Sequence, residues 1–277
     1  MGFILSIFLH PKKAMNSIGF VPTMGYLHEG HLSLVRAARQ YCDRVVVSIF
    51  VNPTQFEPGE DFKRYPRDEE RDRKMLEGLG VDEIWCPTVF DIYPEGFVNA
   101  ERIEPPDALT SVLCGRDRPH HFSGVATVVK RLFEHVQPTD VYFGQKDFQQ
   151  TRVVDWLIDR YFKGIRLHVL PTVREADGLA MSSRNVHLSG EERKHAVLLY
   201  QTLSEVKKRF ESGERRVSVL LEAFEVLQND PLMEVIYAEI LEANYLKSIS
   251  IVDRSAVVFG AVRMGKTRLI DNVELFL

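Results

Sequence analysis

The 277-residue chain has few cysteines, little excess charge of either sign and no long hydrophobic run. Its three cysteines, Cys42, Cys86 and Cys114, are widely spaced and form no C-x-x-C pair, which argues against a disulfide framework or a zinc ribbon. The net charge of −4 argues against nucleic-acid binding through a basic surface. No apolar stretch approaches the roughly 18 residues of a membrane-spanning helix. We therefore expect a cytoplasmic globular protein that binds neither nucleic acid nor a membrane.

Strand-like and helix-like patterns alternate over the first two thirds of the chain. Apolar, β-branched runs typical of buried parallel strands lie at 18–21, 44–51, 83–86, 140–143 and 166–171. Helical patterns lie between them, at 32–38, 68–80, 124–136 and 148–162. This alternation predicts βαβ units and an α/β fold with a doubly wound, Rossmann-like parallel sheet. The apolar run at 3–9 predicts a further short strand at the start of the chain.

The pattern changes after Asn185. Two helical stretches, 189–211 and 217–228, are followed by strand-like runs at 234–240, 256–262 and 267–272. Helices followed by strands indicate a separate small α+β domain, and 277 residues are enough for two domains. We therefore predict a Rossmann-like domain over 1–185 and a smaller α+β domain over 186–277.

The stretch from Gly19 to Arg39 contains the motif H-x-G-H, as His28, Glu29, Gly30 and His31. It lies between a predicted strand and a predicted helix, so its backbone N–H groups and the helix dipole favour an anion. The two imidazoles are three residues apart and share a face of the first turn, where both can donate hydrogen bonds to a phosphate. The same four residues also fit an ordinary helix start with two surface histidines.

Two further loops follow predicted strands at the edge of the sheet where ligands bind. Asn52 and Gln55 are amides that can bind a hydroxyl or a carboxylate, although Asn52 alone fits turn chemistry better because Pro53 follows it. The loop 144–147, Gly-Gln-Lys-Asp, offers a close backbone approach and the point charge of Lys146 to a phosphate. An ordinary strand-to-helix turn with Asp147 as the helix cap is an equally good interpretation.

The loop 181–185, Met-Ser-Ser-Arg-Asn, puts two hydroxyls and a guanidinium together. These groups can donate hydrogen bonds to a triphosphate and offset charge on a leaving pyrophosphate. A polar interdomain linker with serine caps is the alternative. A P-loop pattern at 260–267 is rejected, because a P-loop must be followed by a helix and only ten residues remain after Thr267.

Together these loops resemble one family, the pantothenate synthetases (pantoate–β-alanine ligases) of the H-x-G-H nucleotidyltransferase superfamily. The resembling segments are PTMGYLHEGH at 22–31, VVVSIFVNPTQF at 45–56, YPRD at 65–68, RPHHFSGV at 118–125, YFGQKDFQQ at 142–150, PTVREADGLAMSSRN at 171–185 and RLIDN at 268–272. Two departures are the first seventeen residues, which are unlike the family's usual opening helix, and Thr54, where methionine is common.

The resemblance implies ATP-dependent ligation of pantoate and β-alanine to pantothenate through a pantoyl adenylate, with release of AMP and pyrophosphate. It implies ATP and Mg²⁺, a homodimer and a lid role for the C-terminal domain. The implied catalytic residues are His28, His31, Lys146, Ser182, Ser183 and Arg184, with His31 as proton donor. The implied ATP-binding residues are Met24, Gly25, Tyr26, Leu27, His28, Glu29, Gly30, His31, Gly144, Gln145, Lys146, Asp147, Val173, Met181, Ser182, Ser183 and Arg184. Gln55 and Gln150 are the implied pantoate ligands, Gln55 also bordering β-alanine, and no protein ligand of the metal is assigned.

Two other functions fit part of this pattern. Another H-x-G-H nucleotidyltransferase, acting on a small acid or a phosphate, would lack the paired glutamines and a second acceptor site. A non-catalytic nucleotide sensor with the same fold would be expected to have lost some of His28, His31, Lys146 and Arg184, and all four are present.

Overall fold

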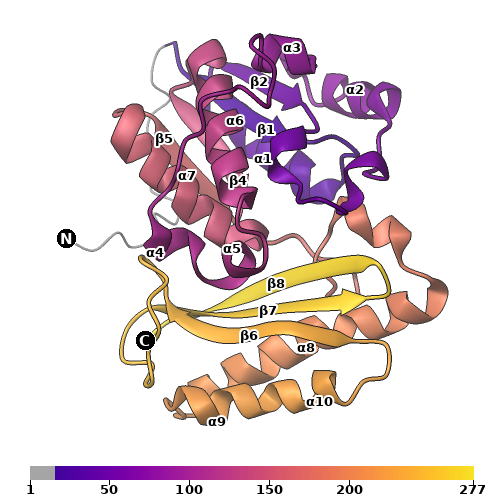
Figure 1. Cartoon of the computed structure of the whole chain (residues 1–277), viewed down its shortest axis with the longest axis vertical. Coiled ribbons are helices and arrows are strands. Elements are labelled where there is room, and N and C mark those ends of the chain that lie inside the picture. The colour runs from indigo at the N-terminus through magenta and orange to yellow at the C-terminus, as the bar shows by residue number, and fades with distance from the viewer. Residues whose placement is uncertain (1–15) are drawn as a thin grey trace. The chain divides into compact units, whose positions relative to one another are not determined.

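A computed structural model describes residues 16–277 and contains two sheets (Figure 1). The larger sheet has the strand order β3-β2-β1-β4-β5, and every neighbouring pair is parallel. Its strands are β1 (Ile18–Thr23), β2 (Arg44–Ile49), β3 (Glu83–Trp85), β4 (Asp140–Gly144) and β5 (Arg166–Leu170). The predicted doubly wound parallel sheet is therefore confirmed. The further strand predicted at 3–9 lies outside the described residues.

Helices cover both faces of this sheet, which explains why β1, β2 and β4 carry apolar side chains at consecutive positions. Consecutive residues of β1 point to opposite faces. Val21 packs in a core with Leu34 and Val35 of α1 (Glu29–Tyr41), whereas the ring of Phe20 meets Phe133 of α6 (His121–Val136). Helix α2 (Glu69–Glu77) adds a buried leucine to the α1 side, and α7 (Phe148–Tyr161) follows β4.

The segment 89–119, between β3 and α6, contains three short helices. They are α3 (Val89–Ile92), α4 (Asp107–Thr110) and α5 (Leu113–Asp117). Single 3₁₀ turns lie at η1 (Pro53–Gln55), η2 (Asp61–Lys63) and η3 (Gln145–Asp147). Between residues 16 and 277, no helix combines the length and the apolar character needed to cross a membrane.

The smaller sheet is antiparallel, in the order β6-β7-β8, and confirms the predicted α+β character of the C-terminal part. Its strands are β6 (Glu234–Glu242), β7 (Ala256–Met264) and β8 (Thr267–Leu275). Helix α8 (Gly190–Glu211) packs on this sheet and shares a core with it. The helical stretch predicted at 217–228 is confirmed, but it is not one continuous α-helix. It is α9 (Val217–Leu221), the 3₁₀ turn η5 (Glu222–Phe224) and α10 (Glu225–Gln228), because the Glu225 amide bonds the carbonyl three residues back.

The rejection of a P-loop is confirmed by this hairpin. Gly260 lies inside β7, Gly265 has a positive φ of 54° in the turn, and Thr267 opens β8. No helix follows, so the backbone forms no phosphate cradle there.

The described residues form two compact units, and each is considered by itself. The first runs to Gln145 and resumes from Gln150 to Pro171, and the second comprises Lys146–Gln149 and Thr172–Leu277. This division falls between 171 and 172, whereas we predicted a domain boundary after 185. It also assigns Lys146 to the second unit, although Lys146 follows a strand of the first.

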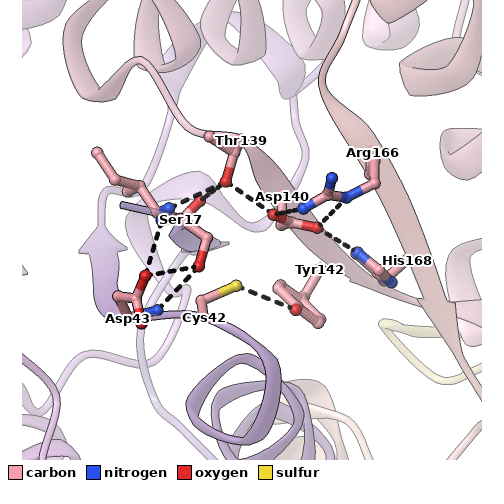
Figure 2. Close-up of polar contacts among 9 residues, drawn as sticks. Ser17, Cys42, Asp43, Thr139, Asp140, Tyr142, Arg166 and His168 are labelled. Carbon is pink, nitrogen blue, oxygen red and sulfur yellow. Dashed lines mark hydrogen bonds and ion pairs between the residues drawn. The ribbon is translucent and has the colours of Figure 1, made fainter. Parts of the chain in front are cut away.

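A polar cluster occupies the edge of the large sheet where the strands begin (Figure 2). The carboxylate of Asp140, the first residue of β4, is 2% exposed and accepts hydrogen bonds from Arg166, His168 and Thr139 at 2.7–2.8 Å. The Thr139 hydroxyl in turn accepts from the Ile18 amide at 2.9 Å. The cluster therefore ties together the starts of β1, β4 and β5, at the edge opposite to the predicted ligand loops.

Candidate functional site

The loop between β1 and α1 carries the H-x-G-H motif, and it leaves the sheet at the point where strand order reverses. Strands β1 and β4 are neighbours there, and ligands of doubly wound sheets bind beyond the carboxyl ends of such strands. The loop turns sharply, because Gly25 and Tyr26 both have positive φ values, 81° and 51°. A non-glycine residue rarely adopts this conformation, so neighbouring groups must hold Tyr26 in it.

The two histidines cap helix α1 reciprocally. His28 is the N-cap, and its Nδ1 accepts a hydrogen bond from the Gly30 amide at 3.1 Å. The His28 amide donates to Nδ1 of His31 at 3.3 Å, and the two rings lie with centroids 4.1 Å apart. Both predicted imidazoles are therefore brought together at the start of the helix. The helix-start interpretation and the phosphate-binding interpretation of the motif are compatible. Each ring uses Nδ1 in the cap, and its second nitrogen, Nε2, is a different atom.

The loop after β2 forms the 3₁₀ turn η1, which presents Gln55. The Asn52 amide is 1% exposed, and its Nδ2 donates to Gln55 Oε1 at 3.1 Å and to the Gly124 carbonyl at 3.2 Å. Asn52 also caps the turn by accepting from the Thr54 amide, so the turn interpretation of Asn52 is confirmed. Gln55 Nε2 lies 3.0 Å from the Met24 sulfur, which places Gln55 beside the H-x-G-H loop.

Helix α6 and the residues just before it contact the Gln55 turn and support it. We did not predict this role. Arg118 Nη2 and His121 Nδ1 lie 3.1 and 2.8 Å from the Gln55 carbonyl, and Arg118 also forms a bidentate ion pair with Glu60. Gly124 approaches the turn so closely that a Cβ there would lie 2.2 Å from the Thr54 carbonyl oxygen. The segment RPHHFSGV therefore has a structural explanation as the support of this turn.

Gln150 lies in the first turn of α7 in the first unit and is half-buried. The first unit thus carries the residues predicted at 24–31, Gln55, Gly144, Gln145 and Gln150, whereas the other predicted site residues belong to the second unit.

In the second unit, β8 holds the loop that contains Lys146. Asn272 Nδ2 donates to the Lys146 carbonyl at 2.9 Å, and the Asn272 side chain is buried. The Lys146 ammonium lies 3.6 Å from the Asp147 carboxylate and is one-fifth exposed. Asp271, the residue before Asn272, is buried beside Arg174, which donates to the Asp271 carboxylate at 2.6 and 3.1 Å. These contacts explain the segment RLIDN, for which no role was predicted.

The remaining predicted residues lie on a short hairpin and the 3₁₀ turn η4 (Ser183–His187). The Met181 amide donates to the Val173 carbonyl at 3.0 Å, and Arg174 and Ala180 form a bridge one step further on. Ser182 caps η4 by accepting from the Arg184 amide, and Ser183 is buried. Strand β8 packs against η4 as well as bonding Lys146, so the second unit brings its two predicted phosphate-binding segments to the same strand.

The described residues include no group of three or more His, Cys, Asp or Glu side chains placed to hold a metal ion. Asp72 was not predicted as a site residue, yet its buried carboxylate accepts hydrogen bonds from two amides of the H-x-G-H loop. Asp72 lies far from this loop in the sequence, so no local pattern indicated the role.

A Rossmann-like parallel sheet with H-x-G-H at the start of the first helix defines an enzyme of the nucleotidyltransferase class. The profile of the family "Pantoate-beta-alanine ligase" matches residues 5–274. The chain is 50% identical over 266 residues to the pantothenate synthetase of Fervidobacterium nodosum, a match covering 95% of this chain and 94% of the relative. The pantothenate synthetase of Thermotoga neapolitana is 49% identical over 268 residues, with coverage of 95% and 94%.

Solved structures agree with these relatives. The crystal structure of pantothenate synthetase from Thermus thermophilus superposes with a TM-score of 0.90 at 47% identity, covering 94% of each chain. That of pantoate-beta-alanine ligase from Francisella tularensis, complexed with beta-gamma ATP and β-alanine, has a TM-score of 0.78 at 36% identity and covers 93% of this chain and 89% of the other. The chain belongs to the pantoate–β-alanine ligase family.

Proposed function

We propose that this chain joins pantoate to β-alanine with ATP, forming pantothenate, AMP and pyrophosphate through a pantoyl-adenylate intermediate. The observation that carries the proposal is the family match over residues 5–274. The capped H-x-G-H loop supports it, because this loop emerges where a doubly wound sheet binds its ligand.

In the first step, a pantoate carboxylate oxygen attacks the α-phosphorus of ATP, and the bond to the bridging oxygen of pyrophosphate breaks. Negative charge grows on the α-phosphate and on the departing pyrophosphate, so donors directed at these groups lower the barrier. We assign this role to six side chains that can donate hydrogen bonds. They are His28, His31, Lys146, Ser182, Ser183 and Arg184. We further assign His31 as the proton donor.

The proposed ATP-binding residues include backbone groups as well as these side chains. Glycines at 25, 30 and 144 permit close approach of the chain to phosphate oxygens. The complete proposed set is Met24, Gly25, Tyr26, Leu27, His28, Glu29, Gly30, His31, Gly144, Gln145, Lys146, Asp147, Val173, Met181, Ser182, Ser183 and Arg184.

Gln55 and Gln150 are the proposed pantoate ligands, and Gln55 also borders the β-alanine position. The fixed position of Gln55 supports this assignment, since its carbonyl and its side-chain oxygen both accept hydrogen bonds from surrounding residues. A neutral amide can bind the hydroxyl or carboxylate of pantoate without bringing a competing charge to the reacting carboxylate.

In the second step, the amine of β-alanine attacks the carbonyl carbon of the adenylate, and AMP leaves. The acyl adenylate is the activated species, so the reaction requires no covalent bond to the protein. Orientation of the amine and exclusion of water then determine the yield, because the adenylate hydrolyses readily. We propose that the C-terminal domain serves as the lid that excludes water.

We propose that Mg²⁺ enters with ATP and is bound chiefly by the phosphate oxygens. We also propose that the enzyme is a cytoplasmic homodimer. Cys42, Cys86 and Cys114 form no disulfide bond, which supports a reducing compartment.

Exchange of labelled pyrophosphate into ATP, without β-alanine, tests the proposal. We expect exchange that requires both pantoate and Mg²⁺, and the formation of AMP and pantothenate once β-alanine is added. In the His31→Ala variant, the rate should fall far more than the affinity for ATP. If the protein were a sensor, the His31→Ala variant would change only in its affinity for ATP. An absence of pantoate-dependent exchange would favour another H-x-G-H nucleotidyltransferase.

A further inference from the structure

A buried carboxylate lies under the H-x-G-H loop and binds it at two points. Asp72, on helix α2, is 0% exposed. Its Oδ2 accepts a hydrogen bond from the Tyr26 amide at 2.6 Å, and its Oδ1 accepts from the Leu27 amide at 2.8 Å. Burial raises the pKa of the Asp72 carboxyl, and the two amide hydrogen bonds and the Arg71 guanidinium oppose this effect. A buried carboxylate is costly, and these bonds offset that cost.

These two amides belong to the part of the loop that has an unfavourable backbone conformation. Tyr26 has a φ of 51°, and Gly25 before it has a φ of 81°. A Cβ on Gly25 would lie 3.2 Å from Asp72 Oδ2, so the loop passes directly over the carboxylate. The two consecutive N–H groups each bond a different oxygen of Asp72, and a carboxylate has two acceptor oxygens whereas a side-chain amide has one. Asp72 therefore stabilises a loop conformation that the local sequence disfavours.

The neighbouring Arg71 holds the other side of the same loop. Its Nη2 donates to the Leu27 carbonyl at 3.0 Å, and its guanidinium lies 5.2 Å from the centre of the Tyr26 ring. The Leu27 residue is thus bound by α2 through both its N–H and its C=O. Leu27 immediately precedes the N-cap residue His28, so the orientation of Leu27 determines the direction in which the chain enters helix α1.

The histidine pair depends on that entry direction. The His28 amide donates to Nδ1 of His31, while Nδ1 of His28 accepts from the Gly30 amide. A rotation of the peptide between Leu27 and His28 would break the first of these bonds and turn both rings. A change at Asp72 would therefore reach the imidazoles through the two peptide bonds that connect Tyr26 to His28.

We propose that Asp72 is a positioning residue for the adenylation step, which holds the H-x-G-H loop in the conformation that directs His28 and His31 at the phosphates of ATP. The Asp72 carboxylate is buried and bonded to two loop amides, so we assign it a positioning role and not contact with the reacting atoms. The inference rests on the proposed function for the identity of the step, although the anchoring of the loop is a property of the contacts above.

The Asp72→Asn variant tests the proposal, because it keeps the size of the side chain and leaves one loop amide facing an NH₂ group. We expect kcat/KM for ATP in pantoate-dependent pyrophosphate exchange to fall about ten- to a hundredfold, since small displacements of catalytic groups cost rates of this order. The KM for pantoate should stay within about threefold, because Gln55 is held by other residues. Assays well below the unfolding temperature, with near-UV circular dichroism, ensure that folded enzyme is compared.

Asp68→Asn is the matched control. Asp68 lies one turn earlier and caps α2 by accepting from the Arg71 amide at 3.1 Å, a role that asparagine fills equally well. We expect this variant to retain wild-type kcat/KM for ATP within about twofold.

Two results would overturn the proposal. One is an Asp72→Asn enzyme with wild-type kcat/KM for ATP. The other is an equal loss for every substrate in proportion to the loss of folded protein, which is what a purely structural role produces. If the wild type shows no pantoate-dependent exchange, the proposed function fails, and the anchoring is tested by ATP titration. We then expect Asp72→Asn to bind ATP about tenfold more weakly than Asp68→Asn, and equal binding would refute the anchoring.

Discussion

At the scale of single residues, His28 combines two roles that can be separated. Its Nδ1 caps helix α1, and Nδ1 of His31 accepts from the backbone in the same way. A ring nitrogen that accepts a hydrogen bond carries no proton, so each neutral imidazole has its proton on Nε2. Nε2 is therefore the nitrogen that can donate to a phosphate oxygen.

The His28→Asn variant separates the cap from the proposed chemistry. Asparagine is a good N-cap, so the free energy of unfolding should change by less than about 0.5 kcal/mol. Loss of one donor at the developing charge should lower the rate of pyrophosphate exchange about a hundredfold or more. His28→Ala removes the cap as well and should cost about 1 kcal/mol of stability, measured by urea unfolding. An unchanged exchange rate in His28→Asn would leave His28 only its role as a cap.

At the scale of elements, the Asp140 cluster holds the starts of three strands together (Figure 2). Burial alone would raise the pKa of Asp140, but hydrogen bonds from His168, Arg166 and Thr139 outweigh it and hold the pKa well below its ordinary value. Because the pKa is lower in the folded than in the unfolded protein, the ionised carboxylate stabilises the fold. This contribution is complete above the unfolded pKa of about 4 and is lost as the pH falls through the folded value.

We predict that Asp140→Asn lowers the free energy of unfolding at pH 7 by about 3 kcal/mol, the low end for a broken buried pair, since Arg166 is half exposed. Between pH 7 and pH 3, the wild type should lose more stability than the variant, which lacks the titrating group. Urea unfolding across this range measures both effects. Asp253→Asn, at an exposed ion pair, is the control and should change stability by less than about 1 kcal/mol. Parallel pH curves for Asp140→Asn and wild type would contradict the prediction.

At the scale of the whole molecule, each compact unit has its own hydrophobic core, and the first unit also exposes large apolar side chains. In the segment 89–98, Phe90 is 71% exposed and Val98 is 79% exposed, and Val89 and Phe97 are also exposed. Four exposed hydrophobic residues within ten positions exceed what scattered surface residues explain, and such groups mark interaction surfaces. This segment is therefore our candidate for the interface of the proposed homodimer.

We predict that the wild type sediments as a dimer at about 10 μM, a concentration at which interfaces of ordinary size are occupied. The double variant Phe90→Asp and Val98→Asp should sediment as a monomer with an unchanged circular dichroism spectrum. Val226→Asp, at an exposed valine of the second unit, is the control and should leave the dimer intact. A monomeric wild type would contradict the homodimer, and a dimeric double variant would place the interface elsewhere.

The sequence by itself determined the features that depend on local patterns. Apolar runs and helical periodicity predicted the parallel sheet and the change to α+β structure. The spacing of apolar residues within a segment indicates which of its faces is buried. Helix-start chemistry brought His28 and His31 together, since they are neighbours in one turn. The strand-like pattern that begins at Thr267, where a P-loop requires a helix, was enough to reject a P-loop.

The tertiary structure alone decided which distant residues support the site. Asp72 bonds an amide 46 positions away, Arg118 bonds the Gln55 carbonyl across 63 positions, and Asn272 bonds the Lys146 carbonyl across 126. None of these contacts has a periodic signal, because each depends on how whole elements pack rather than on the pattern within one. The local sequence therefore predicted the groups that we propose meet the substrate, whereas packing determined the groups that hold them in place.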